Sequence, residues 1–203
     1  MRCPRLAQWL FDLLIVRVAA RRDPDFVVGA DGPGGAYLRR WYLTPWRHWQ
    51  GRLRALAQHR PTAPRRLGAW AAGLLPNLYL HQFLRDDDDR ALHDHPSWSA
   101  SLMLEGRYIE HTIAAGGIHQ RRIHRDGSLR FMGMRHAHRI ALHRQHRWIA
   151  GRGLVHEPIP CWTLFLMGPT VRNWGFHCPQ RGFVPWQRFT AGGRPGEIGR
   201  GCD

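Results

Sequence analysis

The chain has 203 residues, of which 43% are hydrophobic and 10 are Trp, so it is long enough for one domain with a real core and too short for two full domains. Its formal net charge is +15, yet all 30 basic residues are Arg, and they are scattered without a run of five or six. Disorder is excluded for most of the chain, and codon choice in a GC-rich genome explains the charge better than a dedicated nucleic-acid surface does. Nucleic acid is therefore an alternative partner that the sequence does not favour.

The cysteines give a prediction about the redox compartment. Cys3, Cys161, Cys178 and Cys202 contain no C-x-x-C pair. This spacing matches neither a zinc finger nor a dense disulfide framework. We therefore expect reduced cysteines and a cytoplasmic protein.

The chain opens with an apolar stretch at residues 6–20, LAQWLFDLLIVRVAA. It is shorter than the roughly 20 residues that a membrane-spanning helix needs, and it contains Asp12 and Arg17. Its leucines recur at helical spacing, which predicts an amphipathic helix packed on the rest of the domain or on a second subunit. We assign residues 1–36 to this helix and a linker, expect no membrane contact, and keep a homodimer as an open alternative.

The middle of the chain predicts strands around a helical insertion. Residues 37–44, YLRRWYLT, have the aromatic and β-branched content of a strand. Residues 46–76 have helical spacing in WQGRLRALAQ and LGAWAAGLL, separated by a turn with two prolines. Because this segment lies between two expected strands, it predicts a helical insertion that forms a lid or an interface.

Several further short runs indicate strands. LYLHQFL at residues 78–84 and WTLFLM at residues 162–167 are the clearest, and Gly/Pro turns separate the runs. Many short strands with little helix favour an all-β barrel or jelly roll, which we assign to residues 37–189. The Gly- and Arg-rich end, residues 190–203, is predicted to be a mobile tail.

The stretch at residues 91–112, ALHDHPSWSASLMLEGRYIEHT, carries the strongest chemical signal. His93 and His95 are separated by one residue, so on a strand both imidazoles lie on one face and can bind one metal ion. Alternation continues beyond Pro96 to Leu104, which predicts a half-buried strand. The four acids just before it, at residues 86–89, predict a solvated loop paired with its own flanking arginines, with a carboxylate metal site as the alternative.

Two motifs resemble those of the cupin family. His93-Asp94-His95 followed by LMLEG is similar to the beginning and end of the first cupin motif, and residues 131–140, FMGMRHAHRI, are similar to the second motif without its proline. The short motifs HDHP, AHRI and WGFHCP also resemble those of cupin-like proteins common in phages and prophages. The resemblance covers roughly residues 79–186.

This resemblance implies a jelly-roll barrel with a metal ion held by His93, His95 and His138, with His136 as the alternative to His138. One part of the motif is missing, because Ser99 and Ala100 stand where the family has its metal-binding glutamate. Among cupins, three histidines without the glutamate resemble thiol dioxygenases. The favoured cofactor is therefore Fe(II), while Zn, Mn or Ni also suit imidazole ligands.

The predicted function is a metal-binding cupin, specifically a mononuclear non-haem iron oxygenase acting on a small anionic or thiol-bearing molecule. Three protein ligands leave coordination positions open, as in a catalytic site, and loss of a carboxylate favours an anionic substrate. The enzymatic alternative is a sugar isomerase or epimerase of the cupin type. The non-enzymatic alternative is a module that binds a small ligand or nucleic acid in phage functions.

Other side chains are candidates for supporting roles. Tyr108 and Glu110, on the strand after the motif, and His177, near the C-terminus, are candidate acid/base residues. The candidate substrate-binding residues are Arg139 and Arg172, which could bind a carboxylate or phosphate, together with Ser99 and the thiol of Cys178.

Overall fold

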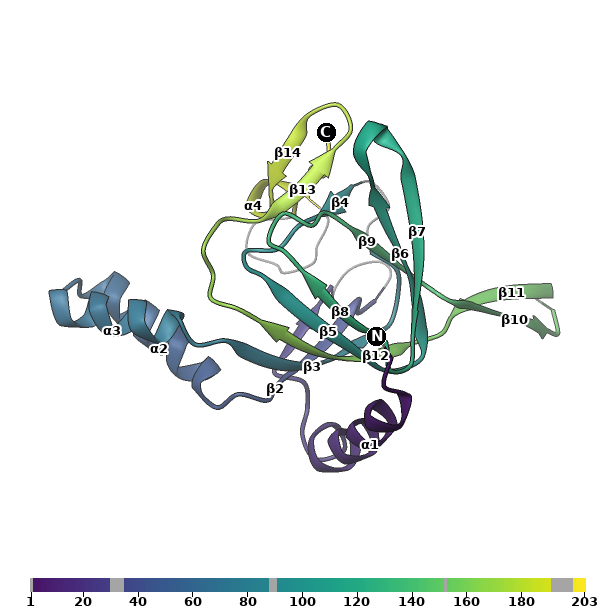
Figure 1. Ribbon diagram of the computed structural model, residues 1–203, viewed down its shortest axis with the longest axis horizontal. Coiled ribbons are helices and arrows are strands. Elements are labelled where there is room, and N and C mark those ends of the chain that lie inside the picture. Colours follow the sequence, from purple (N-terminus) through teal and green to yellow (C-terminus); the bar gives the residue numbers. More distant parts are fainter. Residues whose placement is uncertain (1, 30–34, 88–90, 152, 191–198) are drawn as a thin grey trace.

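The computed structural model describes residues 2–29, 35–87, 91–151, 153–190 and 199–203. The described chain is mainly β and forms a jelly-roll barrel with helices outside it, as Figure 1 shows. The fold class expected from the sequence is therefore confirmed.

The largest element of the barrel is a six-stranded antiparallel sheet. Its strands, in spatial order, are β1 (Phe26–Val28), β2 (Leu38–Tyr42), β3 (Asn77–Phe83), β12 (Cys161–Met167), β5 (Ser99–Glu105) and β8 (Leu129–Met132). Central strand β12 is the apolar run CWTLFLM, paired with β3 along its whole length and with β5 from Trp162 to Met167.

Three smaller sheets complete the β structure. One sheet is formed by β7 (His119–Arg125), β6 (Arg107–Ile113) and β9 (Arg139–Leu142). A second is formed by β14 (Gly182–Pro185), β13 (Gly175–Cys178) and β4 (Leu92–His93). The third is the hairpin of β10 (Arg144–Ile149) and β11 (Gly153–Pro158), which projects from the barrel in Figure 1.

The core lies between the six-stranded sheet and the sheet of β6, β7 and β9. Its buried residues come from the inner faces of both sheets: Leu38, Phe83, Met103, Tyr108, Ile140, Leu142 and Cys161. Gly106 makes the corner where the chain passes from one sheet to the other. Its φ is 85°, and a Cβ there would lie 2.9 Å from the Cβ of Cys161, so a glycine is required.

Helices cover one outer face of the large sheet. Helix α1 (Pro4–Leu14) continues into the π-helical turn η1 (Ile15–Ala19), and their apolar side packs on Trp41, Leu80 and Leu104. Trp41 of β2 and Leu80 of β3, which point outward from the sheet, are thereby buried. Among the described residues, no helix is long and apolar enough to cross a membrane.

The segment at residues 46–76 forms two helices, α2 (Trp46–His59) and α3 (Ala63–Gly73). They pack on each other and extend away from the barrel on the side opposite the β10–β11 hairpin (Figure 1). Buried Gln50 ties their base to the barrel, because its amide oxygen accepts a 3.0 Å hydrogen bond from Asn77 at the start of β3. The remaining short elements are η2 (Ala115–Gly117) and α4 (Trp186–Phe189).

The expected continuous strand through His93 and His95 is wrong. β4 ends at His93, and β5 begins at Ser99 in a different sheet. Pro96 lies in the break, where its carbonyl accepts hydrogen bonds from the backbone of Val171 and Arg172. At Pro96 the backbone is therefore hydrogen-bonded to the loop after β12 and not to a neighbouring strand. The alternation of side chains in the sequence continues across this break and does not reveal it.

The acidic run before β4 also differs from expectation. Asp86 accepts a 2.7 Å hydrogen bond from the backbone of Leu142, and Asp87 accepts one of 2.6 Å from Ile140. Asp86 is also ion-paired with Arg144. These two carboxylates thus fix the loop to β9, and the flanking Arg85 donates to the carbonyl of Gly35 instead. Asp88, Asp89 and Arg90 lie outside the described residues.

The expectation of reduced cysteines is wrong for two of the four. Cys178 and Cys202 form a disulfide with their Cα atoms 5.5 Å apart, whereas Cys3 and Cys161 are free. The backbone carbonyl of Phe189 accepts hydrogen bonds from the backbone of Gly199 and Gly201, and these bonds hold Cys202 near β13. Residues 199–203 of the expected mobile tail are thus tied to the barrel, and residues 191–198 lie outside the described chain.

Candidate metal centre

Three histidines from two chain segments meet inside the barrel. His93 ends β4, and His138 immediately precedes β9. Their backbones exchange two hydrogen bonds, of 2.8 and 2.9 Å, in an isolated antiparallel bridge. His95 follows two residues after His93 and keeps its side chain on the same side, because Asp94 between them points away.

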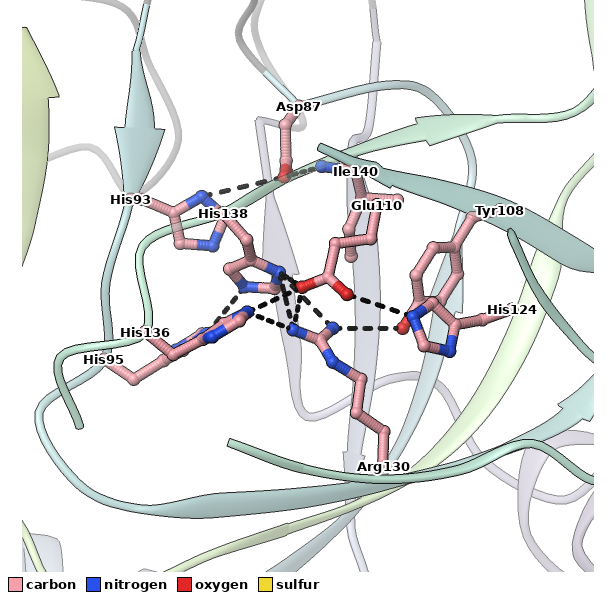
Figure 2. A network of polar contacts seen from close by, with 10 residues as sticks. All are labelled: Asp87, His93, His95, Tyr108, Glu110, His124, Arg130, His136, His138 and Ile140. Atoms are coloured by element: carbon pink, nitrogen blue, oxygen red, sulfur yellow. Dashed lines mark hydrogen bonds and ion pairs between the residues drawn. The ribbon is translucent and has the colours of Figure 1, made fainter. Parts of the chain in front are cut away.

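The ring nitrogens of these three histidines fit one metal ion. One ligand atom from each of His93, His95 and His138 lies within 4.8 Å of the others. The Nε2 atoms of His95 and His138 are 2.9 Å apart (Figure 2). Two imidazole nitrogens bound at right angles to one ion at about 2.1 Å would be about 3.0 Å apart. The closest pair therefore already has the spacing of two ligands of one ion.

The protonation states also suit metal binding, which requires neutral imidazole. Burial lowers the pKa of His95 well below its ordinary value, and the neighbouring His138 and His93 lower it further. Burial likewise lowers the pKa of His138 to about 3, although Glu110 opposes the change. Both rings are therefore neutral at neutral pH, with a lone pair available on one nitrogen.

A second group of ligand-type side chains adjoins the first. Glu110 on β6, His136 and His138 also lie within 4.8 Å of one another. Glu110 Oε1 is 2.8 Å from His136 Nε2 and 3.2 Å from His138 Nδ1, while its other oxygen is 3.0 Å from His124 Nε2. Burial raises the pKa of Glu110, but hydrogen bonds from the three histidines and the charge of Arg130 together hold it well below its usual value.

Arg130 distinguishes the two groups. Its guanidinium forms an ion pair with Glu110 and lies 2.8 Å from His136 Nε2, so a cation already occupies the space beside that carboxylate (Figure 2). Glu110 also approaches His138 at Nδ1, the ring edge opposite the Nε2 that faces His95. The geometry therefore favours His93, His95 and His138 as the ligands, with Glu110 orienting His138 from behind.

Two aspartates hold the first two histidines. Asp87 Oδ2 lies 3.6 Å from His93 Nδ1, which leaves Nε2 of that ring directed at the other histidines. Asp94 is 1% exposed and accepts hydrogen bonds from the backbone of Gly175 at 3.0 Å and from Arg172 at 2.7 Å. The segment from His93 to His95 is thus held at His93 by Asp87 and at Asp94 by Gly175 and Arg172.

Comparison with known proteins finds likeness only among solved structures. No family model matches the chain, and no curated protein matches it. A structure of Bacillus subtilis oxalate decarboxylase, described by its Mn(II) centres, is 13% identical with a TM-score of 0.34, and the match covers 50% of this chain and 23% of that one. A cupin superfamily protein from Desulfitobacterium hafniense is 13% identical with a TM-score of 0.31, covering 46% of this chain and 66% of that one.

A cupin-2 domain protein from Shewanella frigidimarina is similar at the same level. It is 10% identical with a TM-score of 0.32, and the match covers 46% of this chain and 70% of that one. At most half of this chain is matched in these comparisons, and less than a quarter of the oxalate decarboxylase. What the candidate site can bind therefore follows from its own geometry.

Two predicted acid/base residues lie in the network behind the histidines. Glu110 is the centre of that network, as described above. Tyr108 is buried on β6, and burial raises the pKa of its hydroxyl to about 12. The Tyr108 hydroxyl accepts a long hydrogen bond, of 3.5 Å, from Arg130 Nη1.

Two other predicted residues line a pocket beside the site. This pocket has a volume of about 760 Å³, and His177 and Arg139 are both on its wall. His136 and Arg135 also line it, and His136 connects it to Glu110. His177 does not join the three histidines; its Nε2 lies 3.1 Å from Asp94 and its side chain is 40% exposed.

Three predicted substrate-binding residues are placed elsewhere. Nη1 of Arg172 donates to Asp94 and to the carbonyls of His95 and Met134, so this nitrogen holds the ligand loop. Ser99 is fully buried on β5, and its hydroxyl has no hydrogen-bond partner among the described residues. The prediction that Cys178 offers a substrate-facing thiol is wrong, because its sulfur is in the disulfide.

Sequence reasoning missed Arg130 and His124. Arg130 lies on β8 opposite Ser101 of β5, and His124 lies on β7 opposite Tyr108 of β6. Neither residue belongs to a motif, and both reach Glu110 only through cross-strand register. The one available signal was the alternation around Glu110, which places a buried carboxylate inside a barrel and therefore requires a buried cation nearby.

Proposed function

We propose that this protein is a metal-dependent enzyme of the cupin type, in which His93, His95 and His138 hold one divalent ion. The observation that carries the proposal is the meeting of three imidazoles, with ligand atoms within 4.8 Å of one another, beside a carboxylate already paired with Arg130. Such a set supplies three protein ligands and leaves positions open for small molecules.

Iron is the favoured ion and oxygenation the favoured chemistry. Imidazole binds Fe, Zn, Mn and Ni, so the donor atoms alone do not select among them. The ligand set adds no negative charge of its own, which favours an anionic molecule as a further ligand. Ferrous iron, when bound, would supply the chemistry for reaction of such a molecule with dioxygen.

The adjoining pocket supports a small anionic or thiol-bearing substrate. Its described lining residues include Arg135, Arg139, His136 and His177 and no Asp or Glu. Arginine and imidazole side chains on the pocket wall are groups that bind carboxylates and thiolates. His136 lies between the pocket and Glu110, so a substrate there would be separated from the buried carboxylate by one ring.

Oxygen consumption tests this function. The protein is purified without added metal, loaded with ferrous iron under argon, and mixed with air-saturated buffer containing small carboxylates with or without a thiol. We expect substrate-dependent oxygen uptake, lost in His95→Ala and retained in part by His136→Ala. Iron-loaded protein that consumes no oxygen with either class would contradict the oxygenase assignment.

A further inference from the structure

A second group of buried polar side chains lies on the inner wall of the barrel, apart from the three histidines. It is centred on His81 of β3, which is 3% exposed. The His81 ring stacks on Phe165 with centroids 5.0 Å apart, and the Phe165 ring also lies 6.1 Å from the ring of His95. Phe165 thus lies between the two groups, and the group around His81 shares no residue with the three histidines.

Cross-strand register places the members of this group together. Arg40 of β2 is directly opposite His81, and Tyr42 is directly opposite Tyr79 of β3. These side chains share the inner face with the core, because the alternate residues of both strands pack outward on α1. Arg47, in the first turn of α2, completes the group, with its guanidinium carbon 5.4 Å from the Tyr42 ring.

The group has two positive charges and no carboxylate. Among the described residues, neither Arg40 nor Arg47 forms an ion pair. The Arg40 guanidinium carbon lies 4.9 Å from the Tyr79 ring, and that aromatic contact is a weak substitute for a counter-ion. Burial lowers the pKa of Arg40, and the nearby charge of Arg47 contributes to the lowering.

The group also has an excess of hydrogen-bond donors. Arg40 Nε donates to His81 Nε2 at 2.9 Å, so the neutral His81 ring carries its proton on Nδ1. That Nδ1 is buried without a partner among the described residues. Arg47 Nε and the Tyr79 hydroxyl also lack a well-aligned hydrogen bond, although the Arg47 guanidinium is near enough to Tyr79 to oppose the rise that burial causes in the pKa of its hydroxyl. Buried donors are normally satisfied, and the Tyr79 hydroxyl is the one acceptor beside Arg47, so the group as a whole has more donors than acceptors.

We propose that Arg40, Arg47, Tyr79 and His81 form an oxyanion-binding site for a phosphate or carboxylate group of a small molecule. An oxyanion satisfies both needs at once, since it is an acceptor at every oxygen and a counter-ion for two guanidinium groups. Water could accept the hydrogen bonds but would leave the charge uncompensated. The site is separate from the three histidines, so it binds its ligand whether or not metal is present.

Calorimetric titration of the metal-free protein with inorganic phosphate, and separately with acetate, tests this proposal. The buffer contains 0.15 M salt, because screening weakens binding to scattered surface arginines. The test variant is Arg40→Gln/Arg47→Gln. Its matched control is Arg52→Gln/Arg66→Gln, which removes the same charge from exposed positions on α2 and α3.

We expect saturable binding of at least one anion at one site, unchanged in the control and at least tenfold weaker in the test variant. The anion that binds more tightly identifies the ligand class as phosphate or carboxylate. Tyr79→Phe keeps the ring and removes only the hydroxyl, so it should weaken binding severalfold even if the double variant fails to fold. Absence of saturable binding, or equal weakening in both double variants, would overturn the proposal.

Discussion

Asp94 is the residue whose removal should most disturb the metal-ligand loop without touching a ligand. We predict that Asp94→Ala lowers the free energy of unfolding by about 2 to 4 kcal/mol. The buried backbone N–H of Gly175 loses its acceptor, which costs about 1 to 3 kcal/mol. The charged hydrogen bond from Arg172 adds about 1 kcal/mol, discounted because that side chain is 27% exposed and can rehydrate.

Urea unfolding followed by circular dichroism measures this loss, with the slope of the transition checked for constancy. Asp126→Ala is the control, because Asp126 is exposed and its removal should change stability by no more than about 0.5 kcal/mol. Asp94→Asn should fall between the two, since an amide oxygen can still accept from Gly175. If Asp94→Ala unfolds within about 1 kcal/mol of the wild type, the anchoring role is refuted.

Three further changes test other parts of the structure. Glu110→Gln should weaken metal binding about 10- to 100-fold, measured by competition with a chelator, because His138 loses the carboxylate that orients its ring. Unchanged affinity would contradict that role. Burial raises the pKa of the Cys161 thiol to about 12, so iodoacetamide at pH 8 should alkylate Cys3 in the folded protein and Cys161 only after unfolding, as peptide mass spectrometry would show. Leu104→Ala should cost about 2 to 5 kcal/mol in urea unfolding because this 1% exposed side chain packs under α1, whereas 63% exposed Leu67→Ala should cost little; equal effects would contradict the packing.

The parts of the fold that could be predicted are those with a strong local signal. The apolar run of β12 predicts a buried central strand, and the spacing in residues 46–76 indicates helices. The interval of two between His93 and His95 was also informative. It keeps both rings on one side even though β4 ends at His93, because the side chain of Asp94 between them turns away to accept a hydrogen bond from Gly175.

The parts that could not be predicted depend on contacts between distant segments. Arg130 reaches Glu110 because β8 pairs with β5 in one register, and a shift of one residue would turn it outward. The pairing of Cys178 with Cys202 depends on the return of the chain end to Phe189. Neither relation leaves a pattern in the local sequence.

Metal stoichiometry of two histidine variants tests the central claim most directly. His95→Ala removes a member of the three-histidine set alone, and His136→Ala removes a member of the Glu110 group alone. Both proteins are purified without added metal, loaded with the same ferrous solution, desalted and measured by elemental analysis, with circular dichroism to verify folding. We predict about one ion per chain in the wild type and in His136→Ala, and a strong loss in His95→Ala. Full occupancy in His95→Ala together with loss in His136→Ala would contradict the assignment.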